Sequence, residues 1–363
     1  IFSRDELKQS EMIKEYSEKY QSKSRFFIGD LRDKERVNRA LDGIDIVVHA
    51  AALKQVPTAE YNPFEYIKTN IIGAQNLIEA CLDNKVANVI ALSTDKAVAP
   101  INLYGATKLC SDKLFLAANN IKGNRNIKFS VARYGNVMGS RGSVVPFFIK
   151  QKEKGFLPIT HPKMTRFHIS LAQAIETVLY SISNNLGGEI FIPKGPSYRI
   201  LDLAKAIAPN CKTKVTGIRL GEKIDEELIS KNESARVVDL GKYYAVLSST
   251  NLKAEKFYFK KFKKVKKNFI YSSGSNIKFL SIKELEKIFG DAIDLEFAFD
   301  RKKKLNLLQV RKIVKNKNYK NIYSNFLPPF TKLSKKIKKL KREHYNLYGK
   351  TTMFGVMPDW NPA

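Results

Sequence analysis

The sequence predicts an α/β fold built on a doubly wound parallel sheet of the Rossmann type. Short apolar runs that fit buried strands alternate with amphipathic helical stretches from residue 1 to about residue 137. Small or polar residues stand directly after several of these strands, where open α/β sheets place their ligands. A chain of 363 residues with 44% apolar content can bury the core that such a sheet needs.

The expected elements follow one another at the spacing of strand–helix units. Strands are expected at 1–3, 25–28, 45–49, 88–93 and up to 137, and helices at 4–20, 34–41, 67–82 and 102–118. A glycine-rich phosphate turn belongs on the first strand-to-helix connection of such a sheet. We expect it and the first strand to precede residue 1, which would leave the sheet truncated.

Residues 88–108, NVIALSTDKAVAPINLYGATK, hold the candidate chemistry. Thr94, Asp95 and Lys96 follow the strand, and Tyr104 and Lys108 stand four residues apart on one helix face. A neighbouring cation favours phenolate, so the pKa of Tyr104 is expected to fall from about 10 toward the working pH. Thr-Asp-Lys alone would fit a turn cap with a solvated lysine.

Charge and composition exclude several classes of function. The net charge of +29 is concentrated in residues 251–363, which hold 28 Lys+Arg against 9 Asp+Glu. Lysine dominates without an arginine cluster or a base-reading module, which argues against nucleic acid as a partner. Three separated cysteines and four histidines show no ligand spacing, so no metal is expected. No apolar run is long enough to cross a membrane and no signal peptide is visible, so a cytoplasmic location is expected.

Several motifs in order resemble the extended short-chain dehydrogenase/reductase family. They are FSRDE, GDLRD, HAAALKQVP, TNIIGAQN, STDKA, YGATK, RYGNVMGSRGSVVPFF and MTRFHIS. Within that family they are similar to the C5-inverting UDP-N-acetylglucosamine 4,6-dehydratases of the pseudaminic acid pathway. The resemblance spans about residues 1–280, and the combination of STDKA, YGATK and RYGNV makes it specific.

The resemblance implies a lyase mechanism. Tyr104, assisted by Lys108, would take the proton of the sugar 4-hydroxyl while hydride passes from C4 to NADP. Lys96 would then remove the C5 proton and Asp95 would help the C6 hydroxyl leave as water, with Thr94 on the C4 oxygen. Hydride would return to C6 and a proton to the opposite face of C5. A lysine base has to be neutral, which requires a depressed pKa.

Cofactor binding is implied for residues at the ends of several strands. They are Arg4, Asp30, Leu31, Ala50, Ala51, Ala52, Lys54, Asn70, Tyr104, Lys108, Tyr134 and Gly135. The alanine triplet also fits close packing of strand on helix, and Arg4 alone also fits a solvated surface charge. Arg4 favours NADP because it can accept a 2′-phosphate, whereas Asp5 keeps NAD open.

Substrate binding is implied for a second set of residues. They are Lys54, Asn136, Gly142, Ser143, Pro146, Thr165, Arg166, Arg219 and Glu222. Met164–Arg166 is expected in a loop, where Arg166 suits a diphosphate. The segment with Arg219 departs from the family pattern at Leu220 and Asp225, so an ordinary loop before a helix remains an alternative there.

Three regions are expected: a truncated NAD(P)-binding domain at 1–150, a nucleotide-sugar-binding part at 151–285 and a basic extension at 286–363. Residues 243–267 are expected to form a linker or an exposed strand. Residues 291–313, with Glu296, Gln309 and Arg311, and the end 355–363 resemble a fragment of a phosphoenolpyruvate-synthase-like ATP-grasp protein. The fragment lacks a phosphate loop, so no ATP chemistry is expected, and poor packing is expected from about 286 onward.

Three functions remain open. The first is a 4,6-dehydratase acting on a UDP-sugar, in a homo-oligomer that the resemblance makes a hexamer. The second is a nucleotide-sugar 4-epimerase, because YxxxK serves both enzymes and only Asp95-Lys96 separates them. The third is a catalytically inert truncated fragment that acts at most as a basic interaction module, because the missing turn supplies donors for the pyrophosphate.

Overall fold

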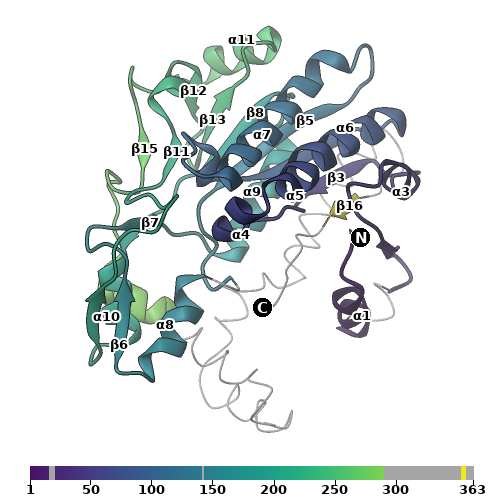
Figure 1. Ribbon diagram of the computed structural model, residues 1–363. Helices are drawn as coiled ribbons and strands as arrows, with labels where there is room; N and C mark the ends of the chain where they lie inside the picture. Colours follow the sequence, from purple (N-terminus) through teal and green to yellow (C-terminus); the bar gives the residue numbers. More distant parts are fainter. Residues whose placement is uncertain (16–20, 141–142, 290–352, 357–363) are drawn as a thin grey trace.

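A ten-stranded sheet organises the protein. The computed structural model describes residues 1–15, 21–140, 143–289 and 353–356. The strand order is β14-β12-β13-β8-β5-β4-β3-β16-β1-β2. Neighbours from β2 to β8 are parallel, whereas β13, β12 and β14 add antiparallel strands at one edge. Figure 1 shows helices in front of and behind this sheet. The predicted parallel α/β fold is confirmed.

The strands of the large sheet are β1 Phe2–Ser3, β2 Phe27–Ile28, β3 Ile46–His49, β4 Asn88–Thr94, β5 Lys128–Tyr134, β8 Glu189–Pro193, β12 Val237–Asp239, β13 Tyr243–Leu247, β14 Lys263–Lys264 and β16 Met353–Val356. The helices around it are α1 Glu6–Glu15, α3 Lys34–Ala40, α4 Val56–Tyr61, α5 Pro63–Ile67, α6 Gly73–Asp83, α7 Leu103–Ile121, α9 Leu171–Asn184 and α11 Leu252–Lys261.

Alternate residues of the central strands enter separate cores on the two faces. Val89 of β4 belongs to the core that contains Leu77 of α6 and Phe115 of α7. Ile90, the next residue, belongs to the core that contains Leu179 of α9. Successive side chains of a strand point to opposite faces. Helices therefore cover both faces, and the continuous apolar run of β4 is explained by burial on both sides.

The strand β16 lies at the point where the strand order reverses. It pairs in parallel with β1 on one side and β3 on the other, with Phe2 opposite Val356 and Ile46 opposite Met353. Chain direction runs outward from this position on both sides, through β3, β4 and β5 and through β1 and β2. Such a switch point is where open α/β sheets form their ligand crevice. The far C-terminal segment thus completes the centre of the sheet.

Proline at position 354 should destabilise the protein if β16 forms this central strand. Phe354→Pro removes a backbone N–H from a strand in the middle of the sheet, where proline costs a hydrogen bond of the ladder. We expect a loss of about 1–3 kcal/mol in the free energy of unfolding, measured with denaturant. Phe354→Leu keeps the N–H and is the control. Equal stability of the proline variant and the control would contradict the pairing.

A second, smaller region lies to one side of the large sheet, at the lower left of Figure 1. Its core contains Phe148 of α8, Leu157 of β6, Leu203 of α10 and Leu285 and Phe289 of the helix 282–289. Its elements are α8 Val144–Lys152, β6 Phe156–Ile159, α10 Ile200–Ile207 and β10 Lys212–Val215. The domain boundaries near 150 and 285 remain predictions, but α8 and the helix 282–289 both run across them.

Two short antiparallel pairs connect the regions. They are β7 Thr165–Phe167 with β9 Ser197–Arg199, and β11 Glu227–Ile229 with β15 Tyr271–Ser272. The prediction that Met164–Arg166 is a loop was therefore wrong, because two of these residues pair with β9. Thr165 and Arg166 are held as part of a strand rather than on a flexible connection.

Two more local predictions were wrong. Residues 243–267 form β13, α11 and β14 instead of a linker, since Tyr258 of α11 packs into a core with Phe191 while the lysines stay outside. The single helix expected from 67 to 82 contains a π-helical segment, Lys68–Ile72, between α5 and α6. The helix expected at 4–20 is described as α1 over Glu6–Glu15; residues 16–20 lie outside the described residues.

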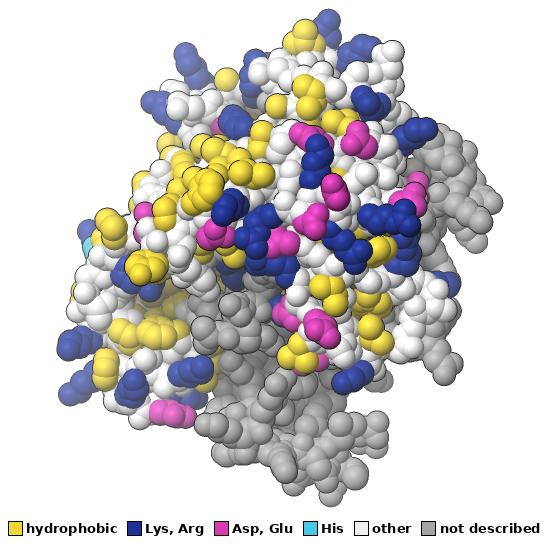
Figure 2. Space-filling view, turned by 45° about the vertical axis from the view of Figure 1, so that its right-hand side comes forward, with side chains coloured by type: hydrophobic (Ala, Val, Ile, Leu, Met, Phe, Trp, Pro, Cys, Tyr) yellow, Lys and Arg dark blue, Asp and Glu magenta, His cyan; other side chains and the backbone are white. Residues whose placement is uncertain are grey.

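The described surface mixes charges of both signs. Figure 2 shows basic and acidic side chains next to one another on one face, with no continuous basic surface there. Exposed ion pairs such as Arg32–Glu65 and Lys68–Glu65 contribute to this mixture. Among the described residues, no helix has the length and apolar character needed to cross a bilayer, and no three potential metal ligands cluster.

Candidate active site

Asp95 and Lys96 lie at the carboxyl end of β4, in the short 3₁₀ helix Asp95–Ala97. Thr94 caps this helix, since its hydroxyl accepts a hydrogen bond from the Lys96 amide, and it donates to Asp95 Oδ1 at 2.9 Å. Lys96 Nζ donates to the same oxygen at 3.0 Å. Asp95 is fully buried, and its Oδ2 has no hydrogen-bond partner among the described residues. The predicted Thr-Asp-Lys group is thus one hydrogen-bonded unit.

The helix α7 brings Tyr104 and Lys108 to this unit. Asn102 caps α7 by accepting a hydrogen bond from the Gly105 amide at 2.8 Å. A Cβ on Gly105 would lie 2.2 Å from the Lys96 carbonyl oxygen, so only glycine allows α7 to approach so closely. The glycine of YGATK therefore sets the distance between the two catalytic candidates, Tyr104 and Lys96.

The structure contradicts the expected fall in the pKa of Tyr104. Burial raises the pKa of this phenol to about 12, although the Lys96 charge opposes the rise. Tyr104 packs with Ala59 of α4 and Tyr66 of α5, which exclude water from the ring. The cation that acts on Tyr104 is Lys96 and not Lys108, as the helical spacing had suggested. Activation of this tyrosine therefore requires more positive charge than the sequence pattern supplies.

Lys108 belongs to a buried chain of charges between α7 and the strands β4 and β5. Its Nζ donates to the Leu92 carbonyl at 2.8 Å, and burial lowers the pKa of this amine while Asp112 opposes the effect. Asp112 accepts from Ser93 Oγ at 2.6 Å and lies 3.5 Å from the Arg133 guanidinium. Because Asp112 stands four residues after Lys108, helical spacing is the signal that could have identified it.

His49 ends β3 close to this chain. Burial lowers the pKa of its imidazole to about 3, and the Lys108 charge adds to this effect. In the unfolded chain this imidazole binds a proton below about pH 6.5, whereas in the folded protein it stays neutral down to about pH 3. The free energy of unfolding therefore has its full value above about pH 6.5 and decreases as the pH falls below it. We expect His49→Leu to lose less stability than the wild type between about pH 7 and about pH 5, by roughly 2 kcal/mol in denaturant unfolding. Identical pH dependence of the two proteins would contradict this expectation.

Arg4 and Asp30, both expected at the adenosine end of the cofactor, form an ion pair of 3.2 Å after β1 and β2. Arg32, which the sequence reading missed, adds a 2.7 Å ion pair to Asp30. Burial would raise the pKa of Asp30, but the hydrogen bonds from Arg32 and the charge of Arg4 hold it below its usual value. Arg32 is the arginine of the GDLRD motif, residues 29–33.

The remaining cofactor candidates line the carboxyl ends of β2 and β3. Ala51 and Leu31 are buried in the main core, and Ala50 and Ala52 flank Ala51. Asn70 lies in the π-helical segment, where its side chain bonds both the amide and the carbonyl of Leu53 at 2.9 Å. Asn70 thus fixes the loop that follows the alanines.

The described residues fit a nicotinamide dinucleotide. Lys108 is a buried ammonium with three donors, yet the described residues offer its Nζ one hydrogen-bond acceptor, the Leu92 carbonyl. Ribose hydroxyls are acceptors that suit such a group. Partial burial and the Lys96 charge lower the pKa of Lys54, so the charges of Lys54 and Lys96 influence each other.

The end of β5 completes the site beside β4. Tyr134 pairs with Thr94 in register, and burial raises the pKa of its phenol. A Cβ on Gly135 would lie 3.2 Å from Asp95 Oδ2, so this glycine leaves open the space beside the carboxylate. Asn136 is exposed next to it. Tyr134 and Gly135 thus lie beside the Thr-Asp-Lys unit, while the roles of Tyr134, Gly135 and Asn136 in binding cofactor and substrate remain predictions.

Ser143 and Pro146 lie at the start of α8, and Gly142 lies outside the described residues. Ser143 is the N-cap residue of α8, yet its buried hydroxyl has no partner among the described residues. The predicted contact of these residues with a sugar nucleotide therefore remains a prediction, with Ser143 offering a hydroxyl that has no internal role.

Thr165 and Arg166 are buried on β7. Thr165 Oγ1 donates to Asp225 Oδ1 at 2.6 Å and lies 2.7 Å from Ser273 Oγ. Arg166 donates to the Thr165 and Ile224 carbonyls at 2.6 and 2.9 Å. Much of its donor capacity is thus satisfied within the protein, which its assignment to a loop did not predict.

The segment 219–226 lies against the loop after the 3₁₀ helix. Lys223 Nζ donates to the Val98 carbonyl at 2.7 Å, and the Asn102 side chain donates to the Gly221 carbonyl at 2.8 Å. Arg219 and Glu222 form an ion pair with each other on the surface. Glu226, the last residue of this segment, lies in the site and forms an ion pair with Lys96 at 3.4 Å. The sequence analysis did not identify it.

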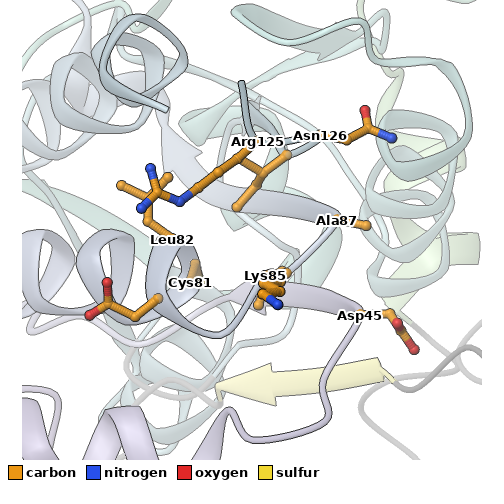
Figure 3. A pocket seen from close by; sticks show the side chains of 10 residues that line it. Asp45, Cys81, Leu82, Lys85, Ala87, Arg125 and Asn126 are labelled. Carbon is orange, nitrogen blue, oxygen red and sulfur yellow. The ribbon is translucent and has the colours of Figure 1, made fainter. Parts of the chain in front are cut away.

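A separate cavity of about 550 Å³ opens at the amino-terminal ends of the strands β3, β4 and β5. Asp45, Ala87 and Ile127, which line it, stand directly before β3, β4 and β5. Figure 3 shows Arg125, which follows α7 in the sequence, and Lys85, which follows α6, beside these residues. Because Asp95 follows β4 at its other end, this cavity is not part of the candidate active site.

Comparison with known proteins decides the family. The profile of the family described as polysaccharide biosynthesis protein matches residues 1–248. The chain belongs to this family, within the extended short-chain dehydrogenases/reductases. A member from Campylobacter jejuni, named UDP-N-acetylglucosamine 4,6-dehydratase (inverting), is 54% identical over 293 residues, which are 78% of this chain and 87% of the relative. A Rickettsia akari member named UDP-glucose 4-epimerase is 44% identical over 79% of this chain and 85% of its own.

Solved structures agree with the family assignment. Pen from Bacillus thuringiensis has 36% sequence identity and a TM-score of 0.73, and the match covers 80% of this chain and 89% of that one. The dTDP-glucose 4,6-dehydratase DesIV from Streptomyces venezuelae, solved with NAD and TYD, has 21% identity and a TM-score of 0.52, with 65% and 80% covered. The second match supports the fold alone.

Proposed function

We propose that the protein is a UDP-N-acetylglucosamine 4,6-dehydratase that inverts C5. The observation that supports this most is the acid-base pair Asp95-Lys96 beside Tyr104 at the carboxyl end of β4. The inverting dehydratase from Campylobacter jejuni is also more similar to this chain than the Rickettsia akari epimerase. A lyase of this class needs both an acid-base group for the 4-hydroxyl and a base for C5.

The residues divide the reaction between them. Tyr104 takes the proton of the 4-hydroxyl, with Thr94 on the same oxygen. A bound oxidised nicotinamide would accept the C4 hydride and later return it to C6, while a proton from solvent would add to the opposite face of C5. Lys96 takes the C5 proton once C4 is a ketone, because the ketone acidifies the neighbouring C–H. Asp95 helps the C6 hydroxyl leave as water.

Binding residues surround these groups. Arg4, Asp30, Leu31, Ala50, Ala51, Ala52, Lys54, Asn70, Lys108, Tyr134 and Gly135 would hold the cofactor, for which we propose NADP, with NAD as the alternative. Lys54, Asn136, Gly142, Ser143, Pro146, Thr165, Arg166, Arg219 and Glu222 would hold the UDP-sugar. We further propose a cytoplasmic homo-oligomer, a hexamer by family resemblance, which light scattering tests.

Product analysis tests the proposed function. The 363-residue chain is incubated with UDP-N-acetylglucosamine and NADP, and the product is identified by NMR. A 4-keto-6-deoxy product with inverted C5 is expected. A 4-epimer as the sole product would replace the dehydratase by the epimerase. No product, together with no melting shift on addition of NADP or NAD, would leave the chain an inert fragment.

A further inference from the structure

Two buried carboxylates from distant parts of the chain hold the Lys96 ammonium. Asp95 Oδ1 lies 3.0 Å from Nζ and Glu226 Oε1 lies 3.4 Å from it. The carboxylate side chains are 0% and 4% exposed, whereas that of Lys96 is 22% exposed. Asp95 precedes Lys96 directly, but Glu226 follows it by 130 positions in the numbering and arrives just before β11.

The backbone fixes Glu226 in this place. Its amide donates to Ser273 Oγ at 2.9 Å, and its carbonyl accepts from the Ser273 amide at 2.8 Å. Arg166 Nε lies 3.9 Å from Oε1, while Oε2 is buried without a hydrogen-bond partner among the described residues. A buried carboxylate is costly unless it is paired. The Lys96 ammonium supplies that pairing, so the position of each charged group depends on the other.

We propose that Glu226 is a positioning residue for Lys96: its carboxylate, brought by the predicted substrate-binding segment, holds the ammonium against Asp95 and controls when the amine can accept a proton. This inference rests on the proposed function for its role in turnover. It concerns a residue outside the Thr-Asp-Lys and YxxxK motifs.

The proton transfers at Lys96 depend on the second carboxylate, Glu226. The ammonium has to release a proton to solvent before the neutral amine can take the C5 proton, while the C–H electron pair moves toward the neighbouring ketone. The same proton then leaves with the C6 hydroxyl as water, so Lys96 ends as an amine and regains a proton from solvent. Each negative charge beside Nζ opposes the first step and favours the ammonium.

The charges around Lys96 agree with this arrangement. Burial alone would lower the pKa of Lys96, but Asp95 and Glu226 outweigh burial and raise it above its ordinary value. A lysine base has to be neutral, and the depressed pKa that this requires is not found while both carboxylates are charged. The other titratable groups that interact with Lys96 are Arg166, Tyr104, Lys54 and Tyr198.

Competitive labelling of Lys96 tests the proposal without turnover. Acetic anhydride acetylates only the neutral amine, so the extent of labelling against pH, measured by mass spectrometry, reports when Lys96 loses its proton. In Glu226→Gln we expect the labelling midpoint to move to lower pH by about 1–3 units relative to the wild type. An unchanged profile, including no labelling of Lys96 in either protein, would overturn the proposal.

Glu227→Gln is the matched control, because it removes the same charge from the next residue, for which the structure shows no contact with Lys96. It should leave the labelling of Lys96 at the wild-type position, and an equal shift in both variants would overturn the proposal. Glu226→Asp keeps the charge and should restore most of the wild-type profile. Melting temperatures establish that the variants are folded.

A second measurement connects the inference to the reaction. Deuterium incorporation at C5 in D₂O should reach its maximum at lower pH in Glu226→Gln than in the wild type, while the rate of C4 oxidation changes little. If the wild type forms no 4-keto-6-deoxy product, the proposed function fails, but the labelling result still decides the role of Glu226. If the wild type is active and the two exchange profiles coincide, the inference alone fails.

Discussion

Tyr104→Phe should slow oxidation of the sugar at C4 by about 10²- to 10⁴-fold, the usual contribution of a positioned acid-base group. The phenol is 9% exposed and its pKa is about 12, so it is protonated in the free protein. Its oxygen accepts the proton of the 4-hydroxyl only after the phenol has lost its own, and phenylalanine offers no such oxygen. The absorbance of reduced nicotinamide in a single turnover measures this step.

The same pKa predicts a pH dependence for the wild type. The phenolate fraction rises with pH up to about 12, so the rate of C4 oxidation should increase with pH throughout the range in which the protein is folded. A bound cationic nicotinamide would lower this pKa from about 12, which would shift the same rise in rate to lower pH without reversing it. A rate independent of pH would contradict Tyr104 as the base.

Tyr66→Phe is the control for Tyr104→Phe. Tyr66 is a buried tyrosine in the same small core, and its hydroxyl donates to the Gln55 carbonyl at 2.7 Å. Its loss should cost about 1 kcal/mol of stability while the oxidation rate stays close to that of the wild type. Equal rates in the two variants would show that Tyr104 acts only through packing.

Lys96→Arg should stop the reaction after oxidation. Arginine keeps the positive charge between Asp95 and Glu226, but it cannot give up its proton in a protein. We expect reduced nicotinamide to form while C5 exchange and 4-keto-6-deoxy product fall by about 10²- to 10⁴-fold. NMR in D₂O measures the exchange and the product together.

Lys113→Arg, an exposed position on α7, controls for the exchange of lysine by arginine itself. It should leave oxidation and dehydration unchanged. If Lys96→Arg still formed product at the wild-type rate, Lys96 would be needed only as a cation. The base for C5 would then have to be sought among the neighbouring carboxylates, Asp95 and Glu226.

Local sequence patterns were sufficient for the fold and for half of the site. The apolar run of β4, the cap at Asn102 and the spacing of Tyr104 and Lys108 depend on neighbours within a few residues, so the sequence predicts them directly. Thr94, Asp95 and Lys96 were placed correctly for the same reason, because side chains after a buried parallel strand lie at its carboxyl end.

Contacts between residues that lie far apart in the sequence could not be predicted from local patterns. Arg133 joins Asp112 of α7 to Glu233 at 2.8 Å, and Glu226 meets Lys96. Neither contact has a local periodicity, since Arg133 and Glu233 are 100 positions apart and Lys96 and Glu226 are 130 positions apart. The buried Arg166 was misplaced in a loop because the pairing of β7 with β9 is equally non-local.

The sequence by itself determined the α/β class, the family motifs and the presence of Asp95-Lys96 near Tyr104 and Lys108. Only the tertiary structure decided that Lys96, not Lys108, is the cation acting on Tyr104, that Glu226 shares Lys96 with Asp95, and that β16 lies at the switch point of the sheet. Burial and through-space charge set these properties, and both depend on which distant segments exclude water from the same place.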